Sequence, residues 1–214
     1  MLTVRSFTFN PVEENTYLVY NEEKNCAVID PGCYFGNERN ELRDFITEKE
    51  LNPVLLLNTH CHLDHVFGNK FIYDTYGLPL HLHPLEQQVL EYAPVSGEKW
   101  NLPFDNYKGP LRFLQPGELI PLGKDMLKVL FTPGHAPGHV VFYCEAQGFV
   151  IGGDVLFNGS IGRTDLPLGD HDTLLNSIRT QLLVLPDDVV VYPGHGPQTT
   201  IDHERKNNPF LRFD

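Results

Sequence analysis

Short runs of apolar residues separated by polar turns dominate the first part of the chain. The Asn-, Glu-, Pro- and Lys-rich segments predict turns, and the apolar runs between them predict three strands that favour antiparallel pairing, at residues 3–9, 16–20 and 26–30. Over residues 37–49 the apolar positions Leu42, Phe45 and Ile46 follow helical spacing instead. The continuous apolar run 54–57 then predicts a buried strand.

The same alternation of apolar runs and turns continues through the rest of the chain. It predicts further strands at residues 80–83, 126–131, 140–143, 149–151 and 189–192. Helices are predicted after Pro84, which is a favourable first helical residue, and at residues 173–185 and 202–207. Because each β-rich half is followed by helices, we expect an α+β fold of two sheets packed face to face with helices outside, not a doubly wound parallel sheet. No shift in composition marks a linker, so residues 1–214 are predicted to form a single domain.

One segment carries candidate chemistry at high density: residues 59–65 read THCHLDH. Alternate positions of an extended chain point to one side, so His60 and His62 can close on one divalent ion, with Asp64 and His65 facing a second. Alternatively, Asp64 is the N-cap of the helix that follows. That interpretation leaves the three histidines without a role, so a metal site is favoured.

Three Gly-rich turns at strand ends present further ligand types, namely His135 in TPGH, Asp154 in GGD and His195 in PGHG. The full set is too large for one four-coordinate ion that keeps an open position, which favours two ions. Our hypothesis is that His60, His62 and His135 bind the first metal, that Asp64, His65 and His195 bind the second, and that Asp154 bridges the two metals with a hydroxide.

Two other groups have more ordinary interpretations. His81 and His83 share one face of a predicted strand, and hydrogen-bonded or solvent-facing histidines are favoured there over another metal site. The aromatic residues Trp100, Phe104 and Tyr107, expected to be exposed, would line a substrate entrance or a dimer contact, or else form a small satellite core.

The ordered motifs THCHLDH, TPGH, GD and GH resemble those of the metallo-β-lactamase superfamily over most of the chain. The resemblance implies a four-layer αβ/βα sandwich with a dinuclear site, the ions being zinc, with iron or manganese as alternatives. Within the superfamily the pattern is most similar to glyoxalase II (hydroxyacylglutathione hydrolase). It is closest to short bacterial glyoxalase II-like hydrolases, which also carry segments like GRTD at 162–165 and NPF at 208–210. Full-length glyoxalase II continues into a helical C-terminal domain, which we do not expect in a chain that stops at Asp214.

This resemblance implies a thioesterase that cleaves S-acylglutathione, such as S-lactoylglutathione, through a metal-bridging hydroxide. Asp64 would also orient the hydroxide. Arg163 lies near the position where the family places a lysine for glutathione, so it is predicted to bind substrate, against the alternative of a surface ion pair. Asp30 would hold a ligand histidine by its free ring nitrogen, or else cap a turn. For His139 a structural hydrogen bond is favoured.

A persulfide dioxygenase is the alternative enzyme class. It would use a single iron bound by two histidines and one aspartate, here His60 or its neighbour with His135 and Asp154. A hydrolase of another ester, a lactone or a lactam is also compatible with the motifs. A non-enzymatic metal-binding module would have closed metal sites, whereas seven ligands for two ions leave open positions.

The formal net charge of −12 argues against nucleic-acid or anionic-membrane partners, which leaves a small-molecule substrate. The N-terminal residues contain no apolar signal-peptide core, and we expect a cytoplasmic protein. The four cysteines have no CxxC spacing and are predicted to be free buried thiols, with Cys61 a small filler behind the site. The sequence does not predict an oligomeric state.

Overall fold

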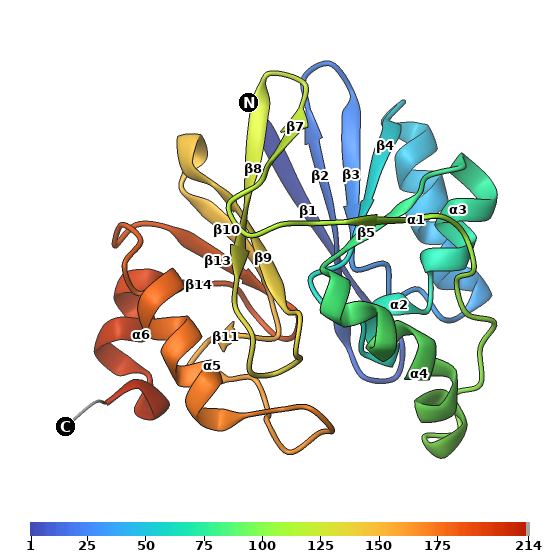
Figure 1. The fold of residues 1–214 in the computed structure, drawn as a ribbon. Coiled ribbons are helices and arrows are strands. Elements are labelled where there is room, and N and C mark those ends of the chain that lie inside the picture. Colours follow the sequence, from blue (N-terminus) through green and yellow to red (C-terminus); the bar gives the residue numbers. More distant parts are fainter. Residues whose placement is uncertain (213–214) are drawn as a thin grey trace. The chain divides into compact units, whose positions relative to one another are not determined.

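The computed structural model describes residues 1–212, which form two compact units (Figure 1). The N-terminal unit comprises residues 1–114 and 121–125, and the C-terminal unit comprises residues 115–120 and those from 126 onward. That the whole chain acts as a single domain stays a prediction. None of the described helices is long and apolar enough to cross a membrane.

The N-terminal unit is built on one six-stranded sheet in simple sequential order. Its strands are β1 (Leu2–Phe9), β2 (Glu14–Asn21), β3 (Asn25–Ile29), β4 (Asn52–Leu57), β5 (Leu80–Leu82) and β6 (Leu111–Phe113). The first three pair antiparallel, as predicted, and β3 to β6 pair parallel. The parallel crossovers carry the helices α1 (Gly36–Glu48), α2 (Leu63–Val66), α3 (Asn69–Tyr76) and α4 (Gln87–Lys99), with a 3-10 turn η1 (Pro84–Glu86) before α4.

Apolar side chains from this sheet and its helices form the core of the N-terminal unit. Leu18 and Leu56 of the sheet pack in it with Leu42 of α1, and all three are fully buried. Each such side chain contributes about 1.5–3 kcal/mol of burial free energy. Tyr107 also lies in this core and Phe104 packs against it, so Tyr107 is not exposed as predicted, whereas Trp100 is 54 % exposed.

The C-terminal unit is built on a second six-stranded sheet with the order β14-β13-β10-β9-β8-β7, of which residues 121–122 of β7 and Asp125 of β8 are assigned to the N-terminal unit. The strands are β7 (Leu119–Leu122), β8 (Asp125–Phe131), β9 (Val140–Cys144), β10 (Phe149–Gly153), β13 (Val190–Pro193) and β14 (Thr199–Thr200), and β11 (Leu156–Phe157) and β12 (Ser160–Ile161) form a small hairpin. The remaining elements are α5 (His171–Ser177), α6 (Ile201–Asn207) and the short helical turns η2 (Glu145–Gln147), η3 (Ile178–Leu182) and η4 (Pro209–Leu211). Strands β10 and β13 are parallel, and their connection carries α5.

The predicted helix 173–185 differs from the observed one. Helix α5 begins at His171 because the Asp170 carboxylate caps it, accepting a hydrogen bond from the Thr173 backbone N–H at 2.8 Å. It then widens into a π-helical turn that ends at Leu182. The apolar residues Leu174, Ile178 and Leu182 of this segment still face the core of the C-terminal unit.

Candidate metal centre

The THCHLDH segment leaves the carboxyl end of β4 and enters the four-residue helix α2. His62 is the N-cap of α2 and makes no side-chain capping hydrogen bond, while Asp64 lies in the first turn. The alternative that Asp64 caps the helix is therefore wrong. Because α2 turns the chain immediately after His62, Asp64 and His65 lie close in space to His60 and His62.

The imidazoles of this segment converge. The ring centroid of His60 lies 4.8 Å from that of His62 and 4.1 Å from that of His65. His65 Nε2 lies 3.6 Å from Asp64 Oδ2. His60 and His65 are fully buried and Asp64 is nearly so. The N-terminal unit thus gathers four of the seven predicted ligands.

Asp30, directly after β3, lies beneath these histidines. Its Oδ1 accepts hydrogen bonds from the Thr59 backbone N–H (2.7 Å) and Asn58 Nδ2 (3.1 Å), and its Oδ2 accepts one from Thr59 Oγ1 (2.6 Å). Asp30 Oδ2 also lies 3.2 Å from His65 Nδ1. Asp30, His60 and His65 each offer a ligand atom within 4.8 Å of the others. The carboxylate therefore both fixes the turn and faces a ligand histidine, the two alternatives that the sequence left open.

Sequence reasoning missed a second buried carboxylate beside His65. Glu14 is fully buried, its Oε2 accepts a hydrogen bond from Thr16 Oγ1 at 2.9 Å, and its Oε1 lies 3.8 Å from His65 Nδ1. Burial raises the pKa of the Glu14 carboxyl well above its usual range, although His65 acts in the opposite direction. No local pattern in the sequence indicates this role, because Glu14 precedes the predicted strand 16–20 and lies in a segment that predicts a turn.

The remaining three predicted ligands come together in the C-terminal unit. His135 Nε2 lies 3.4 Å from Asp154 Oδ2, and His195 Nε2 lies 3.6 Å from the same oxygen. His135 Nδ1 donates to the Arg163 backbone oxygen at 2.7 Å, which orients the ring. His139 Nε2 accepts a hydrogen bond from the Asp154 backbone N–H at 3.0 Å, so the prediction of a structural hydrogen bond is confirmed.

The distances between these donor atoms provide a test of whether they fit a divalent ion. Two donors, each about 2.1 Å from an ion at a tetrahedral angle, lie roughly 3.4 Å apart. Hydrogen bonds between nitrogen and oxygen are shorter, at about 2.7–3.2 Å. The observed separations of 3.4, 3.6 and 3.6 Å match the spacing of ligands around an ion. The donor sets of both units therefore fit metal ions.

The Arg163 side chain forms an ion pair with Asp165, two residues along the chain. Its Nε and Nη2 donate to the two carboxylate oxygens of Asp165, each at 2.7 Å, and both side chains are more than half exposed. These bonds lower the pKa of Asp165 to about 2. The predicted contact of Arg163 with substrate stays a prediction.

Neither His81 nor His83 joins a group of ligands. His81 Nδ1 lies 3.1 Å from the Leu56 and Pro79 backbone oxygens, and His83 Nδ1 accepts a hydrogen bond from the Leu85 backbone N–H at 3.4 Å. The interpretation as hydrogen-bonded strand histidines is confirmed.

Cys61 lies inside the metal motif, but its thiol is shielded from solvent. It is fully buried, and its backbone N–H donates to Glu86 Oε2 at 2.8 Å. Burial raises the pKa of its thiol well above the ordinary value. All four cysteines are free and buried, as predicted, and burial raises the pKa of Cys26 and of Cys33 to about 12.

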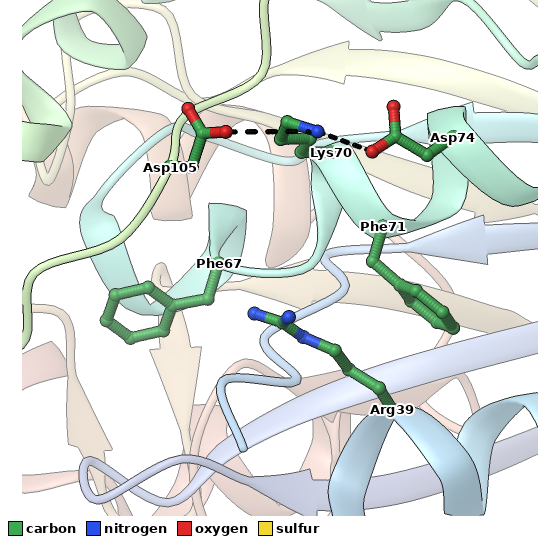
Figure 2. Close-up of a pocket in the computed structure, with 6 residues that line it drawn as sticks. All are labelled: Arg39, Phe67, Lys70, Phe71, Asp74 and Asp105. Carbon is green, nitrogen blue, oxygen red and sulfur yellow. Dashed lines mark hydrogen bonds and ion pairs between the residues drawn. The ribbon is translucent and has the colours of Figure 1, made fainter. Parts of the chain in front are cut away.

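A pocket of about 290 Å³ lies elsewhere in the N-terminal unit, between α1 and α3 (Figure 2). The Arg39 guanidinium lies between the rings of Phe67 and Phe71, and Lys70 lies between Asp74 and Asp105. The two acidic groups neutralise the ammonium charge. None of the predicted metal ligands lines this pocket.

Known proteins place the chain in a family. The sequence profile of the metallo-beta-lactamase superfamily matches residues 9–195. Hydroxyacylglutathione hydrolase GloC of Haemophilus influenzae is 40% identical over 201 residues, which are 93% of this chain and 93% of the relative. The crystal structure of BLEG-1 B3 metallo-beta-lactamase is 36% identical, with a TM-score of 0.91 over 99% of this chain and 100% of that one. TTHA1623 in a di-iron-bound form is 39% identical, with a TM-score of 0.88 over 97% and 100% of the two chains. The predicted fold class is confirmed: the chain belongs to the metallo-β-lactamase superfamily and is a metallohydrolase.

Proposed function

We propose that the protein is a dinuclear thioesterase of the glyoxalase II type, which hydrolyses S-acylglutathione such as S-lactoylglutathione. The observation that carries the proposal is the ligand-like spacing of imidazole nitrogens and carboxylate oxygens within each unit, at 3.4–3.6 Å. The relative from Haemophilus influenzae named hydroxyacylglutathione hydrolase supports the substrate class. The di-iron form of TTHA1623 supports two ions of a first-row metal, here proposed to be zinc.

The seven ligands divide between two ions in this proposal. His60, His62 and His135 would hold one ion, Asp64, His65 and His195 would hold the other, and Asp154 would contribute to both. The orientation of two rings supports this role, because in His65 and His135 the Nδ1 faces an oxygen of the protein while the Nε2 faces a carboxylate ligand. Such outer contacts fix the ring and raise the basicity of the ligating nitrogen.

Bound divalent ions lower the pKa of a coordinated water toward neutrality and polarise the substrate carbonyl. Asp64 would accept a hydrogen bond from the attacking water and direct its oxygen toward the carbonyl carbon. A carbon–oxygen bond then forms, the carbon–sulfur bond breaks, and the sulfur leaves with the electron pair. A thiol has a pKa of about 8.5, so the thiolate leaves without a dedicated general acid.

Arg163 is the proposed contact for a substrate carboxylate. Its guanidinium binds the Asp165 carboxylate through two hydrogen bonds, the geometry that it would offer to a carboxylate of glutathione. Asp165 would then have to release the guanidinium when substrate binds. A β-lactamase activity is the second candidate function, because the similar BLEG-1 structure is named a B3 metallo-beta-lactamase.

The test measures metal content and activity on one sample. Zinc, iron and manganese are quantified per chain, and the same protein is assayed for S-lactoylglutathione hydrolysis, for β-lactam hydrolysis and for oxygen uptake with glutathione persulfide. We expect about two metals per chain with thioester turnover. His195→Ala should lower both, whereas His171→Ala, at an exposed histidine of the same unit, should lower neither.

One iron per chain with oxygen uptake would replace the proposal by the dioxygenase alternative. Lactam turnover without thioester turnover would favour the second candidate. Full activity in the metal-free protein would exclude both forms of the hydrolase.

A further inference from the structure

A turn far from the metal motif in sequence lies against the segment that carries Asp64 and His65. The turn joins β1 to β2 and begins at Asn10, whose φ of +56° lies in the left-handed region that asparagine tolerates better than most residues (Figure 1). Asn10 is buried although it is polar and lies in a turn. Its burial requires partners for its side-chain amide.

The amide of Asn10 is fully used. Its Nδ2 donates to the backbone oxygens of Gly32 (3.0 Å) and Asp64 (3.1 Å), and its Oδ1 accepts from the Val12 backbone N–H (2.9 Å). One side chain therefore ties the β1–β2 turn to a proposed ligand residue 54 positions away.

The Asp64 carbonyl needs this donor because of how α2 ends. In a continuing α-helix the N–H of Gly68 would donate to the Asp64 oxygen, four residues back. Here the Gly68 N–H donates instead to the Pro31 oxygen at 2.7 Å. The next carbonyl, that of His65, accepts a hydrogen bond from Asn58 Nδ2 at 3.0 Å. Side-chain amides thus hold the backbones of two consecutive ligand residues.

Asn10 is itself held from outside the turn. Its backbone N–H donates to Glu38 Oε1 at 2.8 Å, in the first turn of α1. The other carboxylate oxygen of Glu38 accepts from the backbone N–H groups of Tyr34 (2.8 Å) and Phe35 (2.9 Å). The amide of Asn10 is therefore presented to Asp64 from a rigid support.

Gly32 brings the turn close to the ligand segment. A Cβ at Gly32 would lie 2.0 Å from Glu14 Oε2, 2.5 Å from the Asp64 oxygen and 2.8 Å from Asn10 Nδ2. Only glycine fits between these groups, so the backbone at Gly32 packs closely against Glu14, Asp64 and Asn10. Asn10 therefore contacts the Asp64 backbone directly, through the hydrogen bond between them.

We infer that Asn10 is a positioning residue for the proposed metal ligands Asp64 and His65, acting through the Asp64 backbone. This inference assumes the metal binding of the proposed function but does not depend on the proposed substrate. An amide that fixes the ligand turn lowers the cost of ordering it when an ion binds, so its removal weakens binding by roughly 10- to 100-fold, as is usual for groups that support metal ligands.

Two variants and one control test this inference. Asn10→Asp keeps the size and the acceptor of the side chain but cannot donate to the two carbonyls, and Asn10→Gly removes the amide while accepting the positive φ. Asn21→Asp is the matched control. Asn21 is also buried, donates to the Leu122 oxygen at 3.2 Å and accepts from the Asn25 N–H at 3.0 Å, with no bond to a proposed ligand.

Two readouts are measured that do not depend on the substrate. Zinc affinity is obtained by competition with a chromogenic chelator, and hydrogen exchange of residues 60–70 is followed by mass spectrometry in the metal-free protein. We expect both Asn10 variants to bind zinc roughly 10- to 100-fold more weakly and to exchange faster over this segment. Asn21→Asp should leave both readouts at the wild-type values.

Wild-type affinity and exchange in Asn10→Gly would overturn the inference, and so would an equal loss in Asn21→Asp. A wild-type protein that binds zinc but does not cleave thioesters would contradict the proposed function alone. The exchange readout remains decisive for Asn10 even if zinc is not the preferred ion.

Discussion

The two units carry an aspartate at the same place in the same connection, yet the two carboxylates have different surroundings. An antiparallel pair leads through a helix into a parallel strand in both, as β2–β3–α1–β4 and as β9–β10–α5–β13. Asp30 directly follows β3, and Asp154 directly follows β10. The backbone takes up a left-handed conformation at both turns, at Asp30 (φ +48°) and at Gly153 (φ +47°).

The difference lies in what faces each carboxylate. Asp30 accepts three hydrogen bonds from Asn58 and Thr59. Asp154 Oδ2 instead faces the Nε2 atoms of His135 and His195 at 3.4 and 3.6 Å. The surroundings of a strand-end carboxylate therefore suggest its role. Asp30 accepts three hydrogen bonds and faces the Nδ1 of one histidine, so it can position its neighbours. Asp154 Oδ2 faces the Nε2 atoms of two histidines, the arrangement expected of a carboxylate that binds an ion.

The largest effect is expected for Asp154→Asn, because it removes the charge of the proposed bridging ligand. Metal ions supply several kcal/mol of charge stabilisation in such reactions, so kcat/KM should fall more than about 100-fold. Thioester hydrolysis and metal content per chain are measured together. Asp188→Asn, at an exposed aspartate of the same unit, serves as the control and should match the wild type. Two metals and full turnover in Asp154→Asn would remove this residue from the ligand set.

Compared with Asp154→Asn, we expect Asp30→Asn to have a smaller effect on activity and a larger effect on the stability of the fold. The amide replaces an oxygen that accepts from Thr59 and faces His65, which leaves buried groups mismatched and lowers the free energy of unfolding by about 1–3 kcal/mol. Metal affinity should fall roughly 10- to 100-fold. Urea unfolding and chelator competition measure the two quantities. If Asp30→Asn regains most of its activity at saturating metal, Asp30 supports the site without the role proposed for Asp154. If it does not, the two aspartates have similar roles.

The smallest effect is expected at the exposed Arg163–Asp165 pair. The pKa of Asp165 in the folded protein, about 2, lies below its ordinary 3.8, so the stabilisation is present above pH 3.8 and lost as the pH falls toward about 2. Arg163→Gln should lower Tm by at most about 3 °C at pH 6, and by less as the pH falls from 4 to 2.

The same variant tests the predicted contact with substrate. If Arg163 binds a substrate carboxylate, Arg163→Gln raises KM for S-lactoylglutathione, whereas Asp165→Asn, which frees the guanidinium, does not. Equal KM values in both variants and the wild type would leave the surface ion pair as the only role of Arg163.

Much of the fold follows from local patterns in the sequence. The antiparallel start of the N-terminal sheet was predictable because apolar runs alternate with turn residues, and α1 was predictable from the spacing of Leu42 and Ile46. The predicted ligands were found because histidine and aspartate cluster in Gly-rich turns at strand ends. Within each unit the side chains lie close together, and their assignment to two ions stays a prediction.

The supporting residues could not be predicted in the same way. Asn10 reads as an ordinary turn residue, and its contact with Asp64 bridges 54 positions. Glu14 precedes the predicted strand 16–20, whereas β2 begins at Glu14 and buries its carboxylate. The start of α5 at His171 was missed because the first apolar residue of the helical period, Leu174, comes four residues after the capping Asp170. Contacts between distant segments determine these roles, and no local pattern records them.

The burial of Cys61 has a consequence for the proposed thioesterase activity. Acyl groups pass readily from a thioester to a neighbouring thiolate, and a thiol within the catalytic motif would be the first acceptor. Cys61 has no surface open to solvent, and its raised pKa keeps it protonated. The proposed thioesterase would therefore release its thiol product without becoming acylated or forming a mixed disulfide at this position.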